Sequence, residues 1–364
     1  MQRKLLFVTR NLSGGGAERV ISNLANYFST NGYDVTLICL DKGDNKYYIA
    51  PSVKIESLVE RKYKENLIVR LYYALMTFIK LLRVIRKEKP YCTISFITSV
   101  NIWTGLCCFL LNTTYIVSER TAPHYSINKL NALSKWFAYK IYSKAKVVVL
   151  PSKRMLEKYH TIRHFRNLKN FATVYNPVNK FKSPSTNSVH PKNFILAVGR
   201  LNSNKRFEMT IDAFSELREY DVDLLISGIG PIKDTLVKHV AELGLSSRVQ
   251  FIGFQENIQD YYSQATLYVS TSAVEGYPNS LVEALSFGCP AVATDCEFGP
   301  SEIIENGSNG FLIQLNDKEE LVIAMERLLN DTELRSKFSN NAIKINETNS
   351  IDTIATHWNN LIQS

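Results

Sequence analysis

The sequence predicts an α/β protein built from two doubly wound domains that follow one another along the chain. Short apolar runs typical of buried strands alternate with helical patterns, and this alternation indicates parallel sheets. The chain has 364 residues, 45% of them apolar, which is enough for two domains with ordinary cores. A stretch rich in Pro, Ser, Asn and Lys at 179–193 separates two series of apolar runs.

One series of strands is predicted on each side of this stretch. In the first series the strands are 5–9, 35–40, 93–97, 115–118 and 147–150. In the second series they are 194–199, 223–227, 249–253, 267–272, 290–294 and 311–314. We therefore expect an N-terminal domain at 1–178, a linker at 179–193 and a C-terminal domain at 194–349, followed by a helical tail at 350–364.

Three candidate site residues follow the ends of strands in the second series. Arg200 and Lys205 come directly after the strand 194–199. Glu275 follows the strand 267–272. Ligands of doubly wound sheets bind beyond the carboxyl ends of the strands. The positions of these residues therefore predict a ligand site at that edge of the second sheet.

Two glutamates eight residues apart, Glu275 and Glu283, bracket the start of a predicted helix near Asn279. Eight helical residues correspond to a net rotation of about 80°, so the loop before the helix must orient Glu275 independently. Glu283 lies in the first turns, where free N–H groups and the helix dipole favour an anion such as phosphate. Carboxylates also accept hydrogen bonds from the hydroxyls of sugars and riboses. The alternative is that both glutamates cap and solubilise a surface helix.

The order of these motifs resembles the retaining glycosyltransferase family 4. That family has two glutamates separated by seven residues, then a strand of small residues and a Gly-rich turn that opens another helix. This chain has such a strand at 290–295 and such a turn at 299–302. Further segments similar to motifs of the family are 197–201 followed by Lys205, 227–231, 249–253 and the Gly-rich segment 13–19. The resemblance spans nearly the whole chain.

The resemblance implies a GT-B fold, in which two Rossmann-like domains face each other across a cleft and the last helix packs back on the N-terminal domain. It implies a retaining transfer of a hexose or N-acetylhexosamine from a nucleotide-diphosphate sugar, with UDP as the most frequent nucleotide of the family. The segment Thr294–Pro300 resembles members that build surface polysaccharides. A lipid-linked or growing polysaccharide is therefore the expected acceptor.

The resemblance also implies a role for each candidate residue of the donor site. The catalytic residues are Arg200, Lys205 and Glu275: the two cations stabilise the leaving diphosphate, and the carboxylate positions hydroxyls of the donor sugar. Glu283 is expected to bind the ribose. The expected donor-binding residues are Gly15, Gly16, Gly230, Gly276, Tyr277, Pro278, Asn279, Ser280 and Glu283. Because the two cations neutralise the phosphates, we expect neither a cofactor nor a divalent metal.

A second acidic motif, Asp221-Val222-Asp223, spells the D-x-D sequence that metal-dependent glycosyltransferases of another fold use. It comes immediately before the apolar part of the strand 223–227, and so lies at the amino end of that strand. That end is the wrong one for a ligand site. We therefore interpret this motif as structural.

Acceptor-binding residues are expected after the strand 115–118, at Glu119, Arg120 and His124. The guanidinium of Arg120 suits an acceptor phosphate, and the side chain of Glu119 or His124 suits an acceptor hydroxyl. The alternative for a lone histidine such as His124 is an ordinary surface or core residue.

Charge is divided unevenly between the two halves of the chain. Residues 1–190 contain 30 Lys and Arg against 10 Asp and Glu, whereas residues 191–364 contain 13 against 24. An anionic partner is therefore expected for the first half alone. Within it, apolar residues recur at helical spacing among Lys and Arg over 61–89, which predicts contact with an anionic membrane surface. The alternative is a core helix with a solvated basic face.

Other partners and activities are disfavoured. No RNA- or DNA-binding motif accompanies the charge, so no nucleic-acid partner is expected. Six cysteines without metal-ligand spacing indicate a reducing compartment, so we expect a cytoplasmic protein, peripheral at the inner face of the plasma membrane. Arg19 occupies the third glycine position of a dinucleotide fingerprint, which disfavours an oxidoreductase. The remaining alternative is a catalytically silent GT-B scaffold that tethers partners at the membrane.

Overall fold

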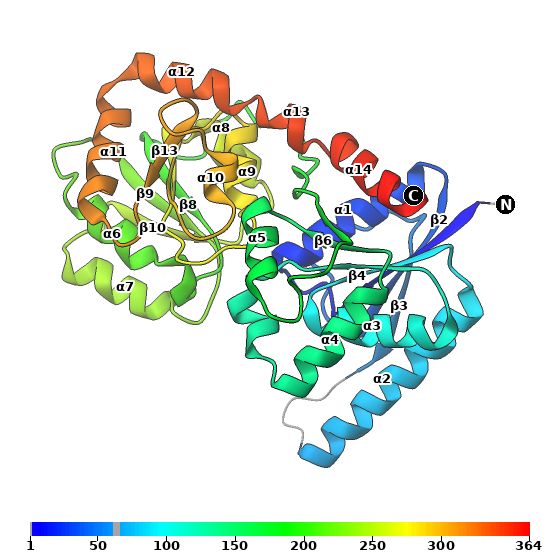
Figure 1. Cartoon of the computed structure of the whole chain (residues 1–364). Helices are drawn as coiled ribbons and strands as arrows, with labels where there is room; N and C mark the ends of the chain where they lie inside the picture. The colour runs from blue at the N-terminus through cyan, green and yellow to red at the C-terminus, as the bar shows by residue number, and fades with distance from the viewer. Residues whose placement is uncertain (1, 61–65) are drawn as a thin grey trace. The chain divides into compact units, whose positions relative to one another are not determined.

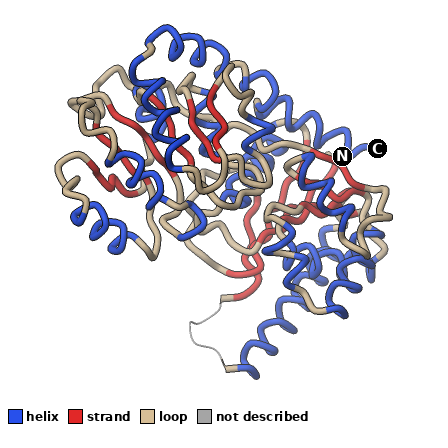
Figure 2. The backbone as a smooth tube through the Cα atoms, turned by 60° about the vertical axis from the view of Figure 1, so that its left-hand side comes forward, coloured by secondary structure: helices blue, strands red, loops and turns tan. Residues whose placement is uncertain are grey.

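The computed structural model describes residues 2–60 and 66–364, and it divides into two compact units. Unit 1 comprises the residues up to Pro177 together with Ile351–Ser364, and unit 2 comprises Val178–Ser350. Each unit contains one parallel sheet flanked by helices (Figure 1, Figure 2). The predicted fold class of two doubly wound α/β domains is therefore confirmed.

The sheet of unit 1 has seven parallel strands. They are β1 (Arg3–Thr9), β2 (Tyr33–Asp41), β3 (Lys54–Val59), β4 (Cys92–Phe96), β5 (Tyr115–Ser118), β6 (Val147–Leu150) and β7 (Phe171–Thr173), in the order β3-β2-β1-β4-β5-β6-β7. The central strands are continuous apolar runs because helices cover a parallel sheet on both faces. The sequence does not predict the edge strands β3 and β7, because β3 is mostly exposed and polar and β7 has only three residues.

Helices connect the successive strands of unit 1, except between β2 and β3, and α14 ends the unit. They are α1 (Gly16–Thr30), α2 (Leu67–Glu88), α3 (Thr98–Leu111), the 3-10 helices η1 (Pro123–Tyr125) and η2 (Ile127–Lys129), α4 (Ala132–Lys144), α5 (Lys153–Thr161) and α14 (Ile351–Gln363). In the part of the chain that the structure describes, no helix is both long and apolar enough to cross a bilayer.

The last helix, α14, completes the core of unit 1. Trp358 is fully buried and stacks on Phe96, with the ring centroids 5.7 Å apart. The hydroxyl of Tyr33 donates a hydrogen bond to Oδ1 of Asn359 at 2.6 Å. Figure 1 shows α14 beside α1, which it contacts. The end of the chain is therefore an integral part of unit 1.

Unit 2 has six parallel strands. They are β8 (Phe194–Val198), β9 (Asp223–Ser227), β10 (Val249–Gly253), β11 (Leu267–Ser270), β12 (Ala291–Thr294) and β13 (Gly310–Ile313), in the order β10-β9-β8-β11-β12-β13. The helices are η3 (Ser203–Lys205), α6 (Phe207–Ser215), α7 (Lys233–Glu242), α8 (Ile258–Gln264), α9 (Asn279–Ser286), α10 (Pro300–Ile303), α11 (Lys318–Asn330), α12 (Thr332–Ala342) and α13 (Ile345–Asn349).

The segment 179–193, expected to be a linker, is held onto unit 2 by hydrogen bonds. The amide of Ser185 donates to Oδ1 of Asp260 at 2.8 Å. The amide of Val189 donates to Oε1 of Gln264 at 3.0 Å. Both acceptors lie on α8. This segment is therefore fixed to the surface of unit 2.

In each sheet the strand order reverses beside the first strand of the unit. The reversal lies between β1 and β4 in unit 1, and between β8 and β11 in unit 2. At such a point the connecting chains leave the adjacent strands in opposite directions, and ligands of doubly wound folds bind at the carboxyl edge there. We therefore expect a ligand site near each of the two reversals.

Candidate active site

The loops that follow β8 and β9 pack directly on each other in unit 2. The amide of Leu201 donates to the carbonyl oxygen of Ile229 at 3.0 Å. A Cβ atom on Gly228 would lie 1.9 Å from the carbonyl oxygen of Gly199, and one on Gly230 would lie 2.1 Å from that of Leu201. Only glycine therefore allows this backbone contact. Gly230, a predicted donor-binding residue, has this structural reason to be glycine.

Lys205 and Glu275, two of the predicted catalytic residues, form an ion pair between Nζ and Oε1. Lys205 ends η3, after β8, and Glu275 follows β11, so the pair spans the reversal of strand order. The backbones are joined as well, since the amide of Ala273 donates to the carbonyl oxygen of Asn204 at 2.8 Å. The two side chains are only 21% and 13% exposed, so water screens their attraction weakly.

Arg200 is adjacent in sequence to Gly199, which the stem of Lys205 contacts, and its side chain is exposed. The stem of Lys205 crosses Gly199, where a Cβ atom would lie 3.2 Å from Cε of the lysine. Arg200 follows Gly199, is exposed, and makes no side-chain hydrogen bond or ion pair with the described residues. An anion at this edge of the sheet would therefore meet one unpaired guanidinium and one ammonium already balanced by a carboxylate.

The loop from Glu275 into α9 contains five predicted donor-binding residues: Gly276, Tyr277, Pro278, Asn279 and Ser280. Tyr277 is buried, and its hydroxyl accepts a hydrogen bond from Nδ2 of Asn349 at 2.9 Å. The hydroxyl of Tyr268 donates a hydrogen bond to Oγ of Ser280 at 2.9 Å. Gly299, with φ of +97°, packs against Pro278 of this loop. Only glycine fits, because a Cβ atom at position 299 would lie 2.5 Å from Cδ of Pro278. The two Gly-containing turns of the motif thus support each other.

Glu283, expected to bind a ribose, is enclosed by its own chain and only 3% exposed. Oε1 accepts a hydrogen bond from Nδ2 of Asn179 at 2.7 Å, and Oε2 accepts one from the hydroxyl of Tyr262 at 3.1 Å. A ribose hydroxyl would have to compete with these donors for the carboxylate. Sequence reasoning missed Asn179 and Tyr262, because both lie far along the chain from the glutamate motif.

The Gly-rich loop after β1 belongs to unit 1, and Glu18 engages its amides. Oε2 of Glu18 accepts hydrogen bonds from the amides of Gly14 at 2.7 Å and Gly15 at 2.8 Å. The sequence predicts donor contacts for Gly15 and Gly16, but in this structure the Gly15 amide caps α1 through Glu18. The glutamate three residues after Gly15 is the sequence signal of a capping box.

Glu119, expected to orient an acceptor hydroxyl, is fully buried. Its carboxylate accepts hydrogen bonds from Oγ1 of Thr98 at 2.7 Å, from Nδ2 of Asn101 at 3.1 Å and from the hydroxyl of Tyr142. Burial raises the pKa of Glu119, and these donors oppose the rise. An acceptor hydroxyl would have to displace one of these donors to reach the carboxylate. In this structure Glu119 ties the loop after β5 to α3 and α4.

Arg120 follows Glu119 and lies on aromatic rings. Its guanidinium carbon is 4.7 Å from the ring centroid of Phe96 and 5.7 Å from that of Trp358. Nη1 donates to Oδ1 of Asn176 at 2.5 Å, whereas Nε and Nη2 are buried and have no partner in the described chain. Burial lowers the pKa of Arg120 to about 9. The third expected acceptor residue, His124, lies on η1 and is exposed.

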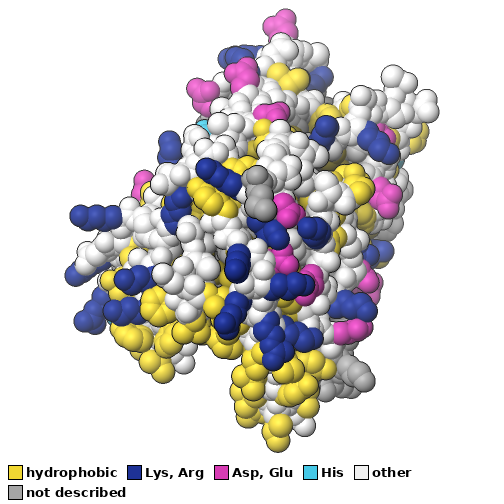
Figure 3. Space-filling model, turned by 90° about the vertical axis from the view of Figure 1, so that its right-hand side faces the viewer, with side chains coloured by type: hydrophobic (Ala, Val, Ile, Leu, Met, Phe, Trp, Pro, Cys, Tyr) yellow, Lys and Arg dark blue, Asp and Glu magenta, His cyan; other side chains and the backbone are white. Residues whose placement is uncertain are grey.

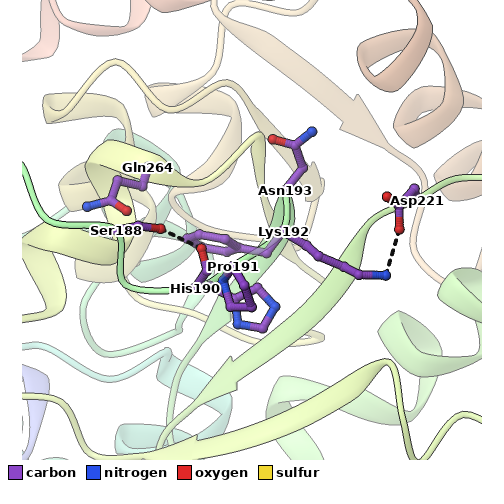
Figure 4. A pocket seen from close by; sticks show the side chains of 8 residues that line it. Ser188, His190, Pro191, Lys192, Asn193, Asp221 and Gln264 are labelled. Atoms are coloured by element: carbon purple, nitrogen blue, oxygen red, sulfur yellow. Dashed lines mark hydrogen bonds and ion pairs between the residues drawn. The ribbon is translucent and has the colours of Figure 1, made fainter.

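The D-x-D aspartates lie at the amino end of β9, away from Lys205 and Glu275. Asp221 pairs with Nζ of Lys192, and Asp223 with Nε2 of His190, each at 2.7 Å. Asp221 borders an open polar hollow of about 400 Å³, together with Lys192 and His190 (Figure 4). No group of three or more His, Cys, Asp or Glu side chains within 2–60 and 66–364 is arranged to hold a metal ion.

Comparison with known proteins divides the chain as the structure does. Residues 14–180 match the family described as Glycosyltransferase Family 4, and residues 178–345 match Glycosyl transferases group 1. An uncharacterized glycosyltransferase of Haemophilus influenzae is 29% identical over 99% of this chain and 100% of its own. An N-acetylgalactosaminyltransferase of Campylobacter jejuni, named for a diphospho-undecaprenol substrate, is 29% identical over 94% of both chains.

Solved structures share the fold over the full length of the chain. Sucrose-phosphate synthase from Thermosynechococcus elongatus has a TM-score of 0.82 at 16% identity and covers 100% of this chain and 98% of its own. Anabaena HepE in complex with UDP has a TM-score of 0.77 at 19% identity, with 99% of both chains covered. At these identities the likeness shows the fold alone.

Proposed function

The chain belongs to the GT-B glycosyltransferases, with a Family 4 first half and a group 1 second half, and on this premise we propose that it extends a lipid-linked or growing polysaccharide. The donor is a nucleotide-diphosphate sugar, carrying UDP and a hexose or N-acetylhexosamine. The transfer retains the configuration at the anomeric carbon. The observation that carries the proposal is the ion pair of Lys205 and Glu275 at the reversal of strand order, with unpaired Arg200 in the loop that leads to Lys205.

The charges that develop on the substrates during transfer are opposite in sign to those of the side chains proposed to bind them. As the bond from the anomeric carbon to the diphosphate breaks, its electron pair moves to the phosphate oxygen, and positive charge spreads over the sugar ring. Arg200 and Lys205 stabilise the departing diphosphate. As the phosphate engages Lys205, the carboxylate of Glu275 accepts hydrogen bonds from sugar hydroxyls. The acceptor hydroxyl bonds to the anomeric carbon and loses its proton to the departing phosphate.

The relatives support the proposed substrates. Two Campylobacter jejuni relatives carry names of transferases that act on undecaprenol-linked saccharides, and an Erwinia amylovora relative is named for amylovoran biosynthesis. HepE and TarM, which share the fold, were solved with UDP. From these names we take the acceptor class and the nucleotide as the proposal for this chain.

We also propose that no divalent metal is required, because two cationic side chains serve the diphosphate. We further propose that the protein binds the inner face of the plasma membrane through residues 61–89. Of these, 61–65 lie outside the described residues, and 67–88 form α2.

The test is a transfer assay with UDP-sugars and undecaprenyl-diphosphate oligosaccharides, read by product mass and by release of UDP. We expect one UDP-sugar to be transferred with retained configuration, at full rate in excess chelator. UDP binding without transfer to any acceptor would favour the silent scaffold instead. A rate lost in chelator and restored only by manganese would contradict the metal-free mechanism.

A further inference from the structure

Among the described residues, those that open α2, 67–72, are all exposed. The exposed large apolar residues of α2 all fall between 67 and 75: Leu67, Ile68, Val69, Leu71, Tyr72 and Leu75. Leu67 and Ile68 are 70% and 77% exposed. The buried apolar residues, Leu81, Val84 and Ile85, all lie in the second half. In Figure 1 the first turns of α2 extend beyond the other elements of unit 1. In the described part of the chain, α2 thus packs through its second half and exposes apolar side chains along its first turns.

A second helix of unit 1, α4, shows the same kind of surface. Leu133 is 71% exposed, and Trp136 and Phe137 are exposed and pack edge to face against each other. α3 lies between α2 and α4 and contacts both helices. Figure 3 shows exposed hydrophobic side chains gathered at the lower end of one face, with Lys and Arg side chains beside them. Isolated apolar side chains are ordinary on a surface, but a group of this size indicates a binding surface.

The charges on these helices are almost all positive. α2, α3 and α4 carry eight Lys and Arg residues, five on α2 and three on α4. Their one carboxylate, Glu88, is paired with Lys4 at 2.5 Å. Nζ of Lys140 lies 5.5 Å from the ring centroid of Trp136 on α4. Apolar side chains bordered by cations, with an aromatic ring among them, fit the boundary between the headgroups and chains of an anionic bilayer.

A second copy of the chain fits this surface poorly. In a two-fold symmetric dimer the same patch faces itself, so the cations of one copy would meet the cations of the other. The helices offer no free carboxylate to balance them. An anionic lipid surface supplies the missing negative charge, and its acyl chains supply the apolar contact.

We propose that α4 is a lipid-contact helix that inserts Leu133, Trp136 and Phe137 into an anionic bilayer, alongside the exposed first turns of α2. This assigns a second helix to the membrane contact proposed above for 61–89. The binding itself does not depend on the proposed function, whereas its use for lipid-linked acceptors rests on that function.

The same helix connects the lipid contact to the loop after β5. Tyr142, near the end of α4, donates a hydrogen bond to the buried carboxylate of Glu119. Glu119 immediately precedes Arg120, which has two unpartnered donors. Insertion of the first turns of α4 therefore holds this loop close to the lipid surface, where a lipid-linked diphosphate is found. This places Arg120 to meet an acceptor phosphate.

Binding to vesicles tests the proposal. Phosphatidylglycerol-containing and pure phosphatidylcholine vesicles are titrated with the full chain, as wild type and as the double variant Trp136→Ser, Phe137→Ser. We expect wild type to prefer the anionic vesicles, and the double variant to bind at least about tenfold more weakly, because it loses two large apolar contacts. The matched control is Val237→Ser, Ile323→Ser, which changes two exposed apolar residues of unit 2 and should bind like wild type.

Tryptophan fluorescence distinguishes direct insertion from an indirect effect. The chain has three tryptophans, and Trp358 is fully buried. We expect a blue shift of emission on binding vesicles in wild type and its absence in Trp136→Phe, which retains an apolar ring and should still bind. A blue shift that persists in Trp136→Phe, or unchanged vesicle binding by the double variant, would overturn the proposal.

Two further measurements distinguish lipid contact from dimerisation and from the proposed sugar transfer. A wild-type dimer in lipid-free solution that the double variant dissociates would assign the surface to a second copy and overturn the lipid proposal. UDP binding is measured in the same samples. Vesicle binding without UDP binding would sink the proposed sugar transfer and leave the lipid contact standing. UDP binding without vesicle binding would sink the lipid contact, including the one proposed for 61–89, and leave the sugar transfer standing.

Discussion

At the scale of single residues, Lys205 and Glu275 balance each other's charge in a largely enclosed position. Removing one partner leaves the other charge uncompensated where water solvates it weakly. A bound diphosphate would satisfy Lys205 in place of the carboxylate. In the function proposed above, the donor diphosphate opens this pair.

We expect Lys205→Ala to lower kcat/KM by about 100-fold or more, since one cation that stabilises the leaving diphosphate is lost. Steady-state kinetics with the preferred UDP-sugar measure the loss. The matched control is Lys192→Ala, which removes a lysine of unit 2 from an exposed pair with Asp221. Equal kinetics for both variants would contradict the role of Lys205.

The order of motifs along the chain is enough to predict that Lys205 and Glu275 lie at the same edge of the second sheet, because both follow the ends of parallel strands. The order of motifs does not predict the surroundings of Glu119, because its hydrogen-bond donors Thr98 and Tyr142 lie on separate helices. Only the packed fold shows that this carboxylate is enclosed. Sequence therefore predicts which residues share an edge of a sheet, but not which of them are exposed there.

Glu283 leads to a prediction about stability in the absence of any ligand. Glu283→Ala removes the carboxylate that accepts hydrogen bonds from half-buried Asn179 and buried Tyr262, and we expect a loss of about 1–3 kcal/mol in the free energy of unfolding. Urea unfolding measures the loss. Glu305→Ala, at an exposed position of unit 2, is the control and should unfold like wild type. A Glu283→Ala variant as stable as wild type that loses UDP binding would contradict this stability role and support the ribose role.

At the scale of elements, the helices and strands that sequence predicts best are the buried ones. Continuous apolar runs such as β1 and β8 are recognisable because both faces of a parallel sheet are covered. The edge strand β3 has exposed Lys54 and Glu56 among its residues and lacks that signal. Pairing with β2, a tertiary contact, defines β3.

The final helix provides a test of how unit 1 is held together. Trp358→Ala would leave a cavity against Phe96 and is expected to cost about 3–5 kcal/mol in the free energy of unfolding. Denaturant unfolding followed by circular dichroism measures this. His357→Ala, the exposed neighbouring position on α14, is the control. If both variants unfold alike, α14 is not part of the core of unit 1.

The basic residues in the second half of α2 give an electrostatic prediction. Arg83, Arg86 and Lys87 are exposed, and each cation near an anionic bilayer contributes about 1 kcal/mol. Changing all three to Gln should weaken binding to anionic vesicles by about two orders of magnitude and reduce its dependence on salt. Lys233, Lys238 and Lys337 of unit 2, changed to Gln together, are the control. Unchanged binding in the α2 variant would remove these residues from the membrane contact.

At the scale of the whole molecule, charge and sequence family divide along the same line. The excess of Lys and Arg falls in the first 190 residues, and the Family 4 match ends at residue 180. The acidic half contains the ion pair proposed to bind the donor. Each unit therefore has its own partner in this account: a nucleotide sugar for unit 2, and a lipid surface with its saccharide for unit 1.

The most direct test of the central claim is thermal unfolding in the presence of UDP, GDP, ADP and their sugars, for wild type and Lys205→Ala. A ligand that binds only the folded state stabilises it by about 2.7 kcal/mol at a hundred times its Kd. We predict that UDP and one UDP-sugar raise the unfolding midpoint of wild type and that Lys205→Ala abolishes most of the shift. Failure of every nucleotide to shift the folded wild type, or an equal shift in the variant, would contradict a donor site at Lys205 and Glu275.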